Sequence, residues 1–357
     1  MSGVTSAIVA PLLNWYDQGH RDLPWRAYPT PYRVWVSEIM LQQTRVQAVL
    51  GYFTRWMEAL PDVRALAEAD ESVYLKLWEG LGYYSRVRNL HRAAVEVCEK
   101  YGGELPADYD TLLSLPGIGD YTAGAIASIA CGIPVPAVDG NVLRVAARLD
   151  NDFTPITDTA FKKRTRARFA DLMPADRPGD LNQSLMELGA MVCLPNGAPL
   201  CGDCPVQHLC LGYHHGNAAL LPLRAAKKAR RIENRTVLLL RHGPLVGLTR
   251  RPASGLLAGL WELPALEGHL SPDETRQALA ARGWQVSSLL SLRPAKHVFT
   301  HVEWHMRGYV LRVRGRGAAE LCWTDRSGLE TERAVPAAFA KFRAAAQNAL
   351  PEQGEET

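Results

Sequence analysis

The sequence predicts a multidomain protein whose two domains differ in fold class, an all-α domain followed by an α+β domain. Its 357 residues suffice for roughly two domains of about 150 residues each, and 47% of them are hydrophobic. Up to residue 213 the chain shows helical segments separated by Gly and Pro turns. From residue 236 short runs rich in leucine and β-branched residues replace that pattern. We therefore expect a helical domain over residues 1–213 and strands within residues 236–346.

In the first domain, four helices are predicted with the clearest pattern. They cover residues 33–57, 75–100, 122–131 and 181–192.

Composition excludes several classes of protein. Charged residues make up 22% of the chain and the formal net charge is +3, unlike a disordered polyelectrolyte. The longest uncharged run, residues 121–138, contains two prolines and several polar residues and does not suit a membrane span. The first 16 residues hold no Lys or Arg, which a secretory signal carries ahead of its apolar stretch. We expect a globular cytoplasmic protein with no membrane partner.

Two basic runs stand out from this near-neutral background. Residues 224–235 hold six Lys or Arg and one Glu, within a segment, 214–235, that we expect to link the domains. This segment is either a solvated linker or a strap that contacts phosphate groups. In residues 162–168 the basic side chains would spread around a helix instead of lining one face, which predicts solvated surface. Residues 347–357 hold three Glu and are expected to be a flexible tail.

Four of the seven cysteines fall within eighteen residues, at Cys193, Cys201, Cys204 and Cys210. In a reducing compartment such a group indicates a metal site and not a disulfide framework. The Cys-x7-Cys-x2-Cys-x5-Cys spacing allows a structural zinc ion or a 4Fe-4S cluster, because thiolates bind both.

The sequence Leu-Pro-Gly-Ile-Gly at residues 115–119 lies between two helical segments. Gly117 and Gly119 would let the turn adopt positive φ and bring bare backbone close to a ligand. The pattern is either an ordinary turn between helices or a helix-hairpin-helix element, which it resembles and which grips the DNA backbone independently of sequence.

Two carboxylates occupy positions suited to acid–base chemistry. Glu38 has mostly apolar neighbours three and four residues away on the expected helix, so burial would raise its pKa and suit it to general acid catalysis. Asp139 precedes an amphipathic helix, where it can cap the helix while its ionised carboxylate faces a developing cation. A solvated glutamate and a simple helix cap are the alternatives.

Taken in order, several motifs resemble those of the MutY family of adenine DNA glycosylases. They are Leu23-Pro24-Trp25-Arg26, Ser37-Glu38 through Thr44, Gly80-Leu81-Gly82-Tyr83-Tyr84, the hairpin, Asp139-Gly140-Asn141, Asn182-Gln183 and the four cysteines. The resemblance implies a helix-hairpin-helix glycosylase with a 4Fe-4S cluster on the four cysteines. It implies a monomeric, nucleoid-associated enzyme that hydrolyses the N-glycosidic bond of adenine opposite 8-oxoguanine or guanine in double-stranded DNA, leaving an abasic site.

The resemblance also assigns catalytic roles to matched residues. Glu38 would protonate the departing adenine, and Asp139 would stabilise the oxocarbenium-like sugar. Tyr121 and Asn141 would line the catalytic pocket.

Other matched residues would bind DNA. Arg26 and Gln183 would contact the flipped adenine. Gln43 and Tyr83 would wedge into the base stack beside the 8-oxoguanine, because an extruded base leaves a gap that must be held open. Gly117 would grip the DNA backbone together with Gly119.

Tyr121 argues against the nearest alternative, an endonuclease III-like glycosylase-lyase. Those enzymes carry a lysine at this hairpin position for a Schiff base, and no lysine occurs between Lys100 and Lys162 here. We therefore expect a monofunctional enzyme. A non-enzymatic iron-sulfur sensor of DNA damage is disfavoured because both candidate carboxylates are present. The chain departs from the family in spacing its first two cluster cysteines by seven residues instead of six, which the 195–199 loop can absorb.

The second domain resembles the Nudix fold in residues 249–252 and 259–264. Hydrolytic Nudix domains bind divalent metal through glutamates of one helix, but the matching residues 276–283 contain none, so we expect a recognition module without nucleotide hydrolysis. Phe299, Thr300 and His301 resemble the family's Phe-Ser-His tip that contacts 8-oxoguanine, with Thr in place of Ser.

Overall fold

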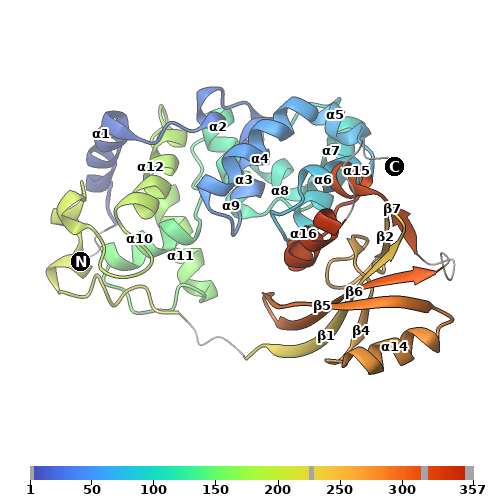
Figure 1. Ribbon diagram of the computed structural model, residues 1–357. Coiled ribbons are helices and arrows are strands. Elements are labelled where there is room, and N and C mark those ends of the chain that lie inside the picture. Colours follow the sequence, from blue (N-terminus) through green and yellow to red (C-terminus); the bar gives the residue numbers. More distant parts are fainter. Residues whose placement is uncertain (1–3, 225–228, 315–320, 350–357) are drawn as a thin grey trace. The chain divides into compact units, whose positions relative to one another are not determined.

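A computed structural model describes residues 4–224, 229–314 and 321–349. The chain divides into two compact units (Figure 1): Met1–Ala69 with Ser85–Ala226, and Asp70–Tyr84 with Lys227–Thr357. The sequence did not indicate that Asp70–Tyr84 packs with the second unit. Within the described ranges, no helix is both long enough and apolar enough to cross a membrane.

The first unit is helical, which confirms its predicted class. Its α-helices are α1 (Val9–Gly19), α2 (Pro24–Ala27), α3 (Pro31–Leu41), α4 (Val46–Ala59), α5 (Val63–Glu68), α7 (Ser85–Tyr101), α8 (Tyr109–Ser114), α9 (Asp120–Ala125), α10 (Gly140–Leu149), α11 (Thr159–Ala170), α12 (Pro178–Met191) and α13 (Leu211–His214). A π-helical turn, Ile126–Ala130, continues α9.

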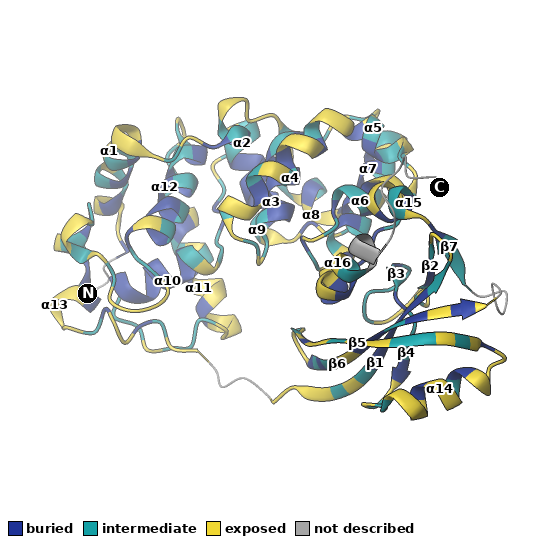
Figure 2. Ribbon diagram, in the orientation of Figure 1, coloured by how far each residue is buried: buried dark blue, intermediate teal, exposed yellow. Residues whose placement is uncertain are grey.

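Helices α3 and α10, which carry or follow the two candidate carboxylates, lie deep in this unit (Figure 2). α3 begins where the Thr30 side chain accepts a hydrogen bond from the backbone N–H of Arg33, and Pro31 occupies its first turn. Eight of its eleven residues are buried, and so are eight of the ten residues of α10. Burial around most of a helix surface indicates a central position in the core.

Two of the long helices expected from the sequence are interrupted. The helix predicted over 33–57 breaks between α3 and α4, where Gln43 has a φ of 57°. The helix predicted over 75–100 is wrong in its first part, because α6 (Glu71–Leu77) ends before a turn and α7 begins at Ser85. Tyr83 in that turn has a φ of 48°. Right-handed helices exclude positive φ, so both turns must end a helix that the apolar pattern would continue.

The second unit contains a seven-stranded mixed sheet, which confirms the α+β prediction. Its strands are β1 (Arg231–His242), β2 (Leu245–Arg250), β3 (Trp261–Glu262), β4 (Ala265–Glu267), β5 (Gln285–Val298), β6 (Val302–Arg314) and β7 (Cys322–Thr324). The main order is β3-β2-β1-β6-β5, with β4 paired to β1 and β7 to β2. β1 and β6 run parallel and the other pairs antiparallel.

Strand β1 begins at Arg231, inside the segment that the sequence analysis treated as a linker. Residues 225–228 of that segment lie outside the described residues, as do residues 350–357 of the expected tail. Of the basic run, Lys227 and Lys228 lie outside the described residues, Arg224 and Arg230 precede the strand, and Arg231 and Arg235 lie on β1.

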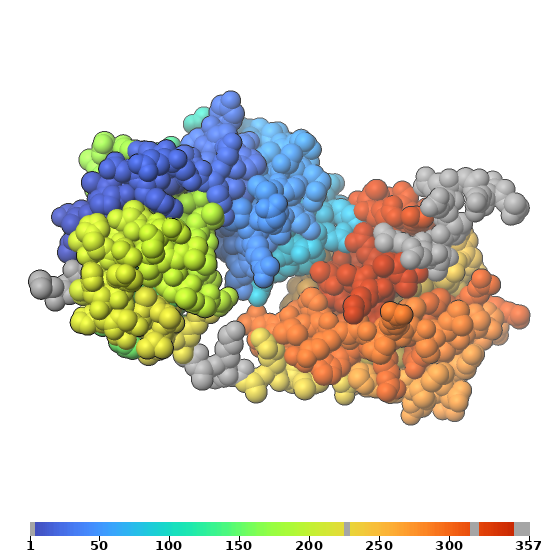
Figure 3. Space-filling view, turned by 60° about the vertical axis from the view of Figure 1, so that its left-hand side comes forward, coloured from blue at the N-terminus to red at the C-terminus, as the bar shows by residue number. Residues whose placement is uncertain are grey.

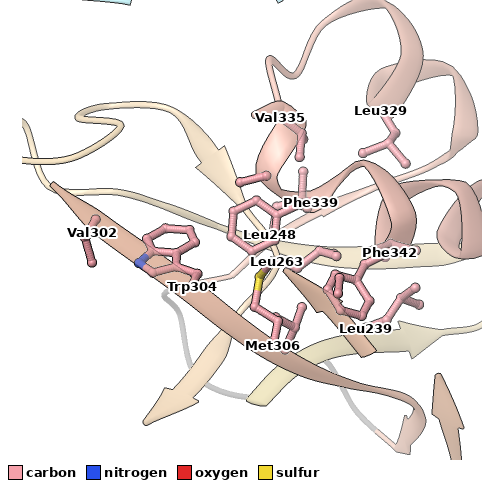
Figure 4. Packing of buried hydrophobic residues seen from close by; sticks show 14 residues of the cluster. Leu239, Leu248, Leu263, Val302, Trp304, Met306, Leu329, Val335, Phe339 and Phe342 are labelled. Carbon is pink, nitrogen blue, oxygen red and sulfur yellow. The ribbon is translucent and has the colours of Figure 1, made fainter. Parts of the chain in front are cut away.

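Both faces of this sheet are covered. Along β1, Val237 and Leu239 pack in one cluster with residues of α15 (Arg326–Thr331) and α16 (Ala340–Ala349), as Figure 4 shows for Leu239, Leu329 and Phe342. The alternate residues, Leu238 and Leu240, pack on the opposite face with Leu279 of α14 (Pro272–Ala280). A continuous apolar run in a central strand follows from this two-sided burial.

One close approach fixes a glycine in this core. A Cβ added at Gly308 on β6 would lie 2.2 Å from the Phe342 ring, so only glycine lets α16 pack this closely on the sheet.

Candidate active site

A cavity of about 470 Å³ opens in the first unit. Seven of the residues singled out from the sequence line it: Arg26, Glu38, Gln43, Tyr121, Asp139, Asn141 and Gln183. They come from α2, α3, α9, α10, α12 and two turns, so side chains distant in sequence converge on one pocket. Its size is that of a site for a small molecule or one extruded base.

Glu38 lies in the wall of this pocket with only 6% of its surface exposed. Burial raises the pKa of its carboxyl to about 7, and the nearby Asp139 carboxylate adds to the rise. The Tyr121 hydroxyl donates a hydrogen bond to Glu38 Oε2. Burial also raises the pKa of Tyr121 well above its ordinary value, so the phenol keeps its proton and remains a donor.

Asp139 lines the same pocket and caps the N-terminus of α10. Its Oδ1 accepts hydrogen bonds from the backbone N–H groups of Asn141 and Val142 at 2.9 and 2.8 Å, and its Oδ2 accepts one from Asn141 Nδ2 at 2.6 Å. Burial raises its pKa, although these three hydrogen bonds oppose that rise by favouring the carboxylate. The cap role and the pocket position therefore coexist in one side chain.

Glu187 is a pocket residue that the sequence analysis missed. It is buried, and Arg21 Nε and Arg26 Nη2 donate to its two oxygens at 2.7 and 2.8 Å. Burial alone would raise its pKa, but the hydrogen bonds from the two arginines lower it to about 2. The available signal was its spacing, since Glu187 lies four residues after Gln183 on the same face of α12.

The pocket thus holds Glu38, whose pKa is raised to about 7, beside Glu187, whose pKa is lowered to about 2. Different pKa values for neighbouring carboxyls allow different chemical roles.

A chain of hydrogen bonds joins the pocket to the cysteine-rich loop. Arg144 Nη2 donates to Asn141 Oδ1 at 2.8 Å and to the carbonyl of Gly189 at 2.7 Å, while its Nε donates to the carbonyl of Cys193 at 2.8 Å. One helical turn further along α10, Arg148 Nη1 donates to Cys193 Sγ at 3.1 Å. Two buried arginines therefore tie the base of the pocket to the first of the four cysteines.

The four cysteines line a second hollow with apolar residues of α10 and α12. Figure 3 shows the yellow-green surface of this region lying against the dark blue N-terminal residues, and Ile8, Leu12, Val206 and Cys210 share one apolar cluster. The described cysteines are all free thiols. No set of three or more His, Cys, Asp or Glu among the described residues is arranged to hold a single metal ion.

This donor set suits an iron-sulfur cluster. Four thiols around one hollow match the ligand chemistry of such a cluster. The Arg148 guanidinium is placed to offset thiolate charge.

The two hairpin glycines have different reasons to be glycine. Gly117 has a φ of 78°, and an added Cβ would lie 2.6 Å from Cβ of Asn89, so a side chain is excluded twice. Gly119 has a φ of −101°, so the expectation that both glycines adopt positive φ is wrong. An added Cβ at Gly119 would meet no atom within 4 Å, which leaves open space beside the backbone.

The predicted tip, Phe299, Thr300 and His301, is the turn between β5 and β6 in the second unit. Thr300 and His301 are exposed, while Phe299 packs edge-on against Trp304 with ring centroids 4.8 Å apart. Arg230 Nε and the Arg231 backbone N–H donate to the carbonyls of Phe299 and His301, both at 3.1 Å. The tip is thus held through its backbone, which leaves two polar side chains accessible.

The two residues predicted to wedge into DNA share backbone strain. Gln43 lines the pocket of the first unit, whereas Tyr83 belongs to the second, where its hydroxyl lies 3.3 Å from Thr300 Oγ1. Both have positive φ, which few non-glycine residues of the described chain adopt. Strain of this kind clusters at functional sites.

Comparisons with known proteins define the class. The family described as "HhH-GPD superfamily base excision DNA repair protein" matches residues 36–171, and the NUDIX domain matches residues 236–345. A solved structure of a thermostable thymine-DNA glycosylase aligns with a TM-score of 0.52 and 26% identity, over 58% of this chain and 96% of that one. The chain is therefore a base-excision DNA-repair glycosylase of the helix-hairpin-helix class with a Nudix-like domain.

Sequence relatives narrow the class further. Adenine DNA glycosylase of Mus musculus is 39% identical over 362 residues, covering 85% of this chain and 70% of the relative. The enzyme of Homo sapiens is 36% identical over 365 residues, covering 85% and 67%. The chain belongs to the adenine DNA glycosylase family.

Proposed function

We propose that this protein hydrolyses the N-glycosidic bond of adenine paired with 8-oxoguanine, or less readily with guanine, in double-stranded DNA. The observation that carries the proposal is the buried Glu38 carboxyl, whose pKa of about 7 suits it to donate a proton inside a pocket the size of a base.

In the first step Glu38 transfers its proton to a ring nitrogen of the flipped adenine. The bond between adenine and the deoxyribose then breaks, and its electron pair leaves with the base. The Tyr121 hydroxyl orients the Glu38 carboxyl through its hydrogen bond to Oε2. Protonation of the leaving group is effective because the purine would otherwise depart as an anion that carries the electron pair of the broken bond.

In the second step the sugar cation is stabilised and captured. Asp139, fixed by three hydrogen bonds at the start of α10, supplies negative charge near the cation. Water adds to the anomeric carbon, and its proton returns to the Glu38 carboxylate. The atoms then balance as adenine plus an abasic sugar.

Arg26 and Gln183 are proposed to position the adenine before the bond breaks. Arg26 is held by Glu187 and lines the pocket with Gln183. Because the Arg26 guanidinium is fixed by a buried ion pair, its remaining donors can hydrogen-bond to the base without a search through side-chain rotamers.

The four cysteines are proposed to hold a 4Fe-4S cluster. When bound, such a cluster would fix the loop after α12, and the thiolates would be balanced in part by Arg148. Purified protein should contain about four irons per chain. Zinc in stoichiometric amount and no iron, in protein prepared without oxygen, would overturn this assignment.

One assay tests the proposed function and its alternatives. A labelled duplex carrying adenine opposite 8-oxoguanine is incubated with the protein and then treated with or without alkali. Cutting at adenine only after alkali is expected, because the hairpin has Tyr121 where a lyase would need lysine. Cutting without alkali would indicate a glycosylase-lyase, and binding without cutting would indicate a damage sensor.

A further inference from the structure

Three side chains beside the hairpin form a polar cluster that the catalytic site does not use. They are Tyr109 at the start of α8, Asp120 at the start of α9 and Arg166 on α11. The Tyr109 hydroxyl donates to Asp120 Oδ1 at 2.9 Å, and Arg166 Nη1 lies 3.7 Å from the same oxygen. The Arg166 guanidinium lies over the Tyr109 ring, 4.9 Å from its centroid. We call these residues the hairpin cluster.

Arg166 differs from the other two arginines of α11. The sequence predicts solvated surface for all three, but Arg164 donates to Asp152 at 2.5 Å and Arg168 makes a direct hydrogen bond to Asp150. Arg166 reaches Asp120 only at ion-pair distance, beyond hydrogen-bond length, and its buried Nε has no hydrogen-bond partner among the described residues. Its charge is therefore positioned but incompletely satisfied.

Asp120 has an unfavourable position for a DNA-binding hairpin. It directly follows Gly119, whose backbone faces open space, and 68% of its side chain is exposed. A DNA phosphate that approached this backbone would meet the Asp120 carboxylate, and the two negative charges would repel. The position of Asp120 becomes favourable only if a nearby cationic side chain can pair with either the carboxylate or the phosphate.

We propose that Arg166 is a ligand for the DNA backbone, and that Asp120 holds its guanidinium in place until a phosphate replaces the carboxylate as its partner. A guanidinium can donate two parallel hydrogen bonds to a phosphate, which is stronger than the long ion pair in the free protein. Stacking on Tyr109 keeps the guanidinium oriented during the exchange.

Tyr109 keeps Asp120 in place during the same exchange. Burial raises the pKa of Tyr109 to about 12, so its hydroxyl stays protonated and continues to donate to the carboxylate. The proposal rests on the proposed grip of the hairpin on DNA. It adds a phosphate contact by Arg166, and it implies that the Asp120 carboxylate weakens binding to undamaged duplex.

The test measures the affinity for an undamaged duplex as a function of salt. Each protein–phosphate contact contributes about 0.9 to the slope of log K against log salt. Arg166→Gln should reduce that slope by about 0.9, and Arg166→Lys, which keeps the charge, should restore most of it. Arg164→Gln is the matched control on the same helix, because its charge is already paired, and it should leave the slope unchanged.

Asp120→Asn provides an independent arm that keeps the size of the side chain and its hydrogen bond from Tyr109. Removal of the negative charge should tighten binding to undamaged duplex about threefold to tenfold at low salt. An unchanged slope in Arg166→Gln, or unchanged affinity in Asp120→Asn, would overturn the proposal. Excision of adenine by the parent protein, measured in parallel at saturating enzyme, distinguishes this failure from failure of the proposed function.

Discussion

The proposed catalytic pocket and the exposed tip differ in how their side chains are held. In the pocket, Glu38 is 6% exposed and accepts a hydrogen bond from Tyr121, and its burial raises its pKa. At the tip, Thr300 and His301 are exposed, and the hydrogen bonds that fix the turn go to the backbone. Proton transfer requires a group removed from water, whereas reading an opposite base requires side chains that the base can reach. We therefore expect that mutations in the pocket impair excision and that mutations at the tip impair recognition.

The largest effect is expected from Glu38→Gln. Glutamine keeps the size of the side chain but has no transferable proton, so excision should fall by about 10² to 10⁴ in single-turnover experiments. Affinity for the substrate duplex should be preserved. A rate within tenfold of the parent would show that Glu38 is not the acid.

Arg144→Gln should have the next largest effect, because it breaks the link between Asn141 and the cysteine loop. Hydrogen bonds from a charged donor to three acceptors would be lost or weakened, and we expect excision to slow about 10-fold to 150-fold with iron retained. Arg148→Gln is the comparison, since Arg148 contacts Cys193 Sγ but not Asn141. It should lower iron content more than it changes the rate per iron-loaded protein. Loss of iron in Arg144→Gln, or a slower rate with full iron content in Arg148→Gln, would contradict these assignments.

His301→Ala should change the choice of base pair and leave the rate of adenine excision largely unchanged. Loss of one hydrogen bond to the base opposite adenine should reduce the preference for 8-oxoguanine over guanine about 5-fold to 150-fold. Binding and single-turnover assays on both duplexes measure this ratio. His297→Ala is a suitable control because His297 is half-buried and packs against Phe299 instead of facing solvent at the turn. An unchanged ratio in His301→Ala would assign recognition to Gln43 and Tyr83.

The smallest expected change in excision rate comes from pH, and its sign follows from the raised pKa of Glu38. Excision should fall as pH rises through about 7, where the acid loses its proton. The folded protein holds that proton above the ordinary value of 4.5, so the free energy of unfolding should decrease as pH rises from 4.5 to 7.

Glu38→Gln should remove this pH dependence of stability. At pH 8 the variant should be more stable than the parent by up to about 3 kcal/mol, with little difference near pH 4. Denaturant titrations at both pH values measure the difference. Equal stability at pH 8 would contradict the burial cost assigned to Glu38.

The sequence predicted the parts of the molecule that local patterns encode. Helical and strand periodicity identified the two fold classes, and motifs located seven residues that prove to share one pocket. The sequence did not predict the turns at Gln43 and Tyr83, because the apolar pattern of a helix continues across a single residue with positive φ. The sequence also did not predict the ion pairs of Glu187 or the hydrogen bonds of Arg144, because both depend on packing between segments distant in sequence. The same reason hid the association of Asp70–Tyr84 with the second unit.

Single-turnover excision and binding by Glu38→Gln and His301→Ala, each on duplexes with adenine opposite 8-oxoguanine and opposite guanine, test the separation of the two sites most directly. The glutamine variant should lose excision on both duplexes and retain the parent's binding preference. The alanine variant should retain the excision rate on saturated duplex and lose the preference. If both variants lose rate and preference together, the pocket and the tip act as one site, and the account given for this protein is wrong.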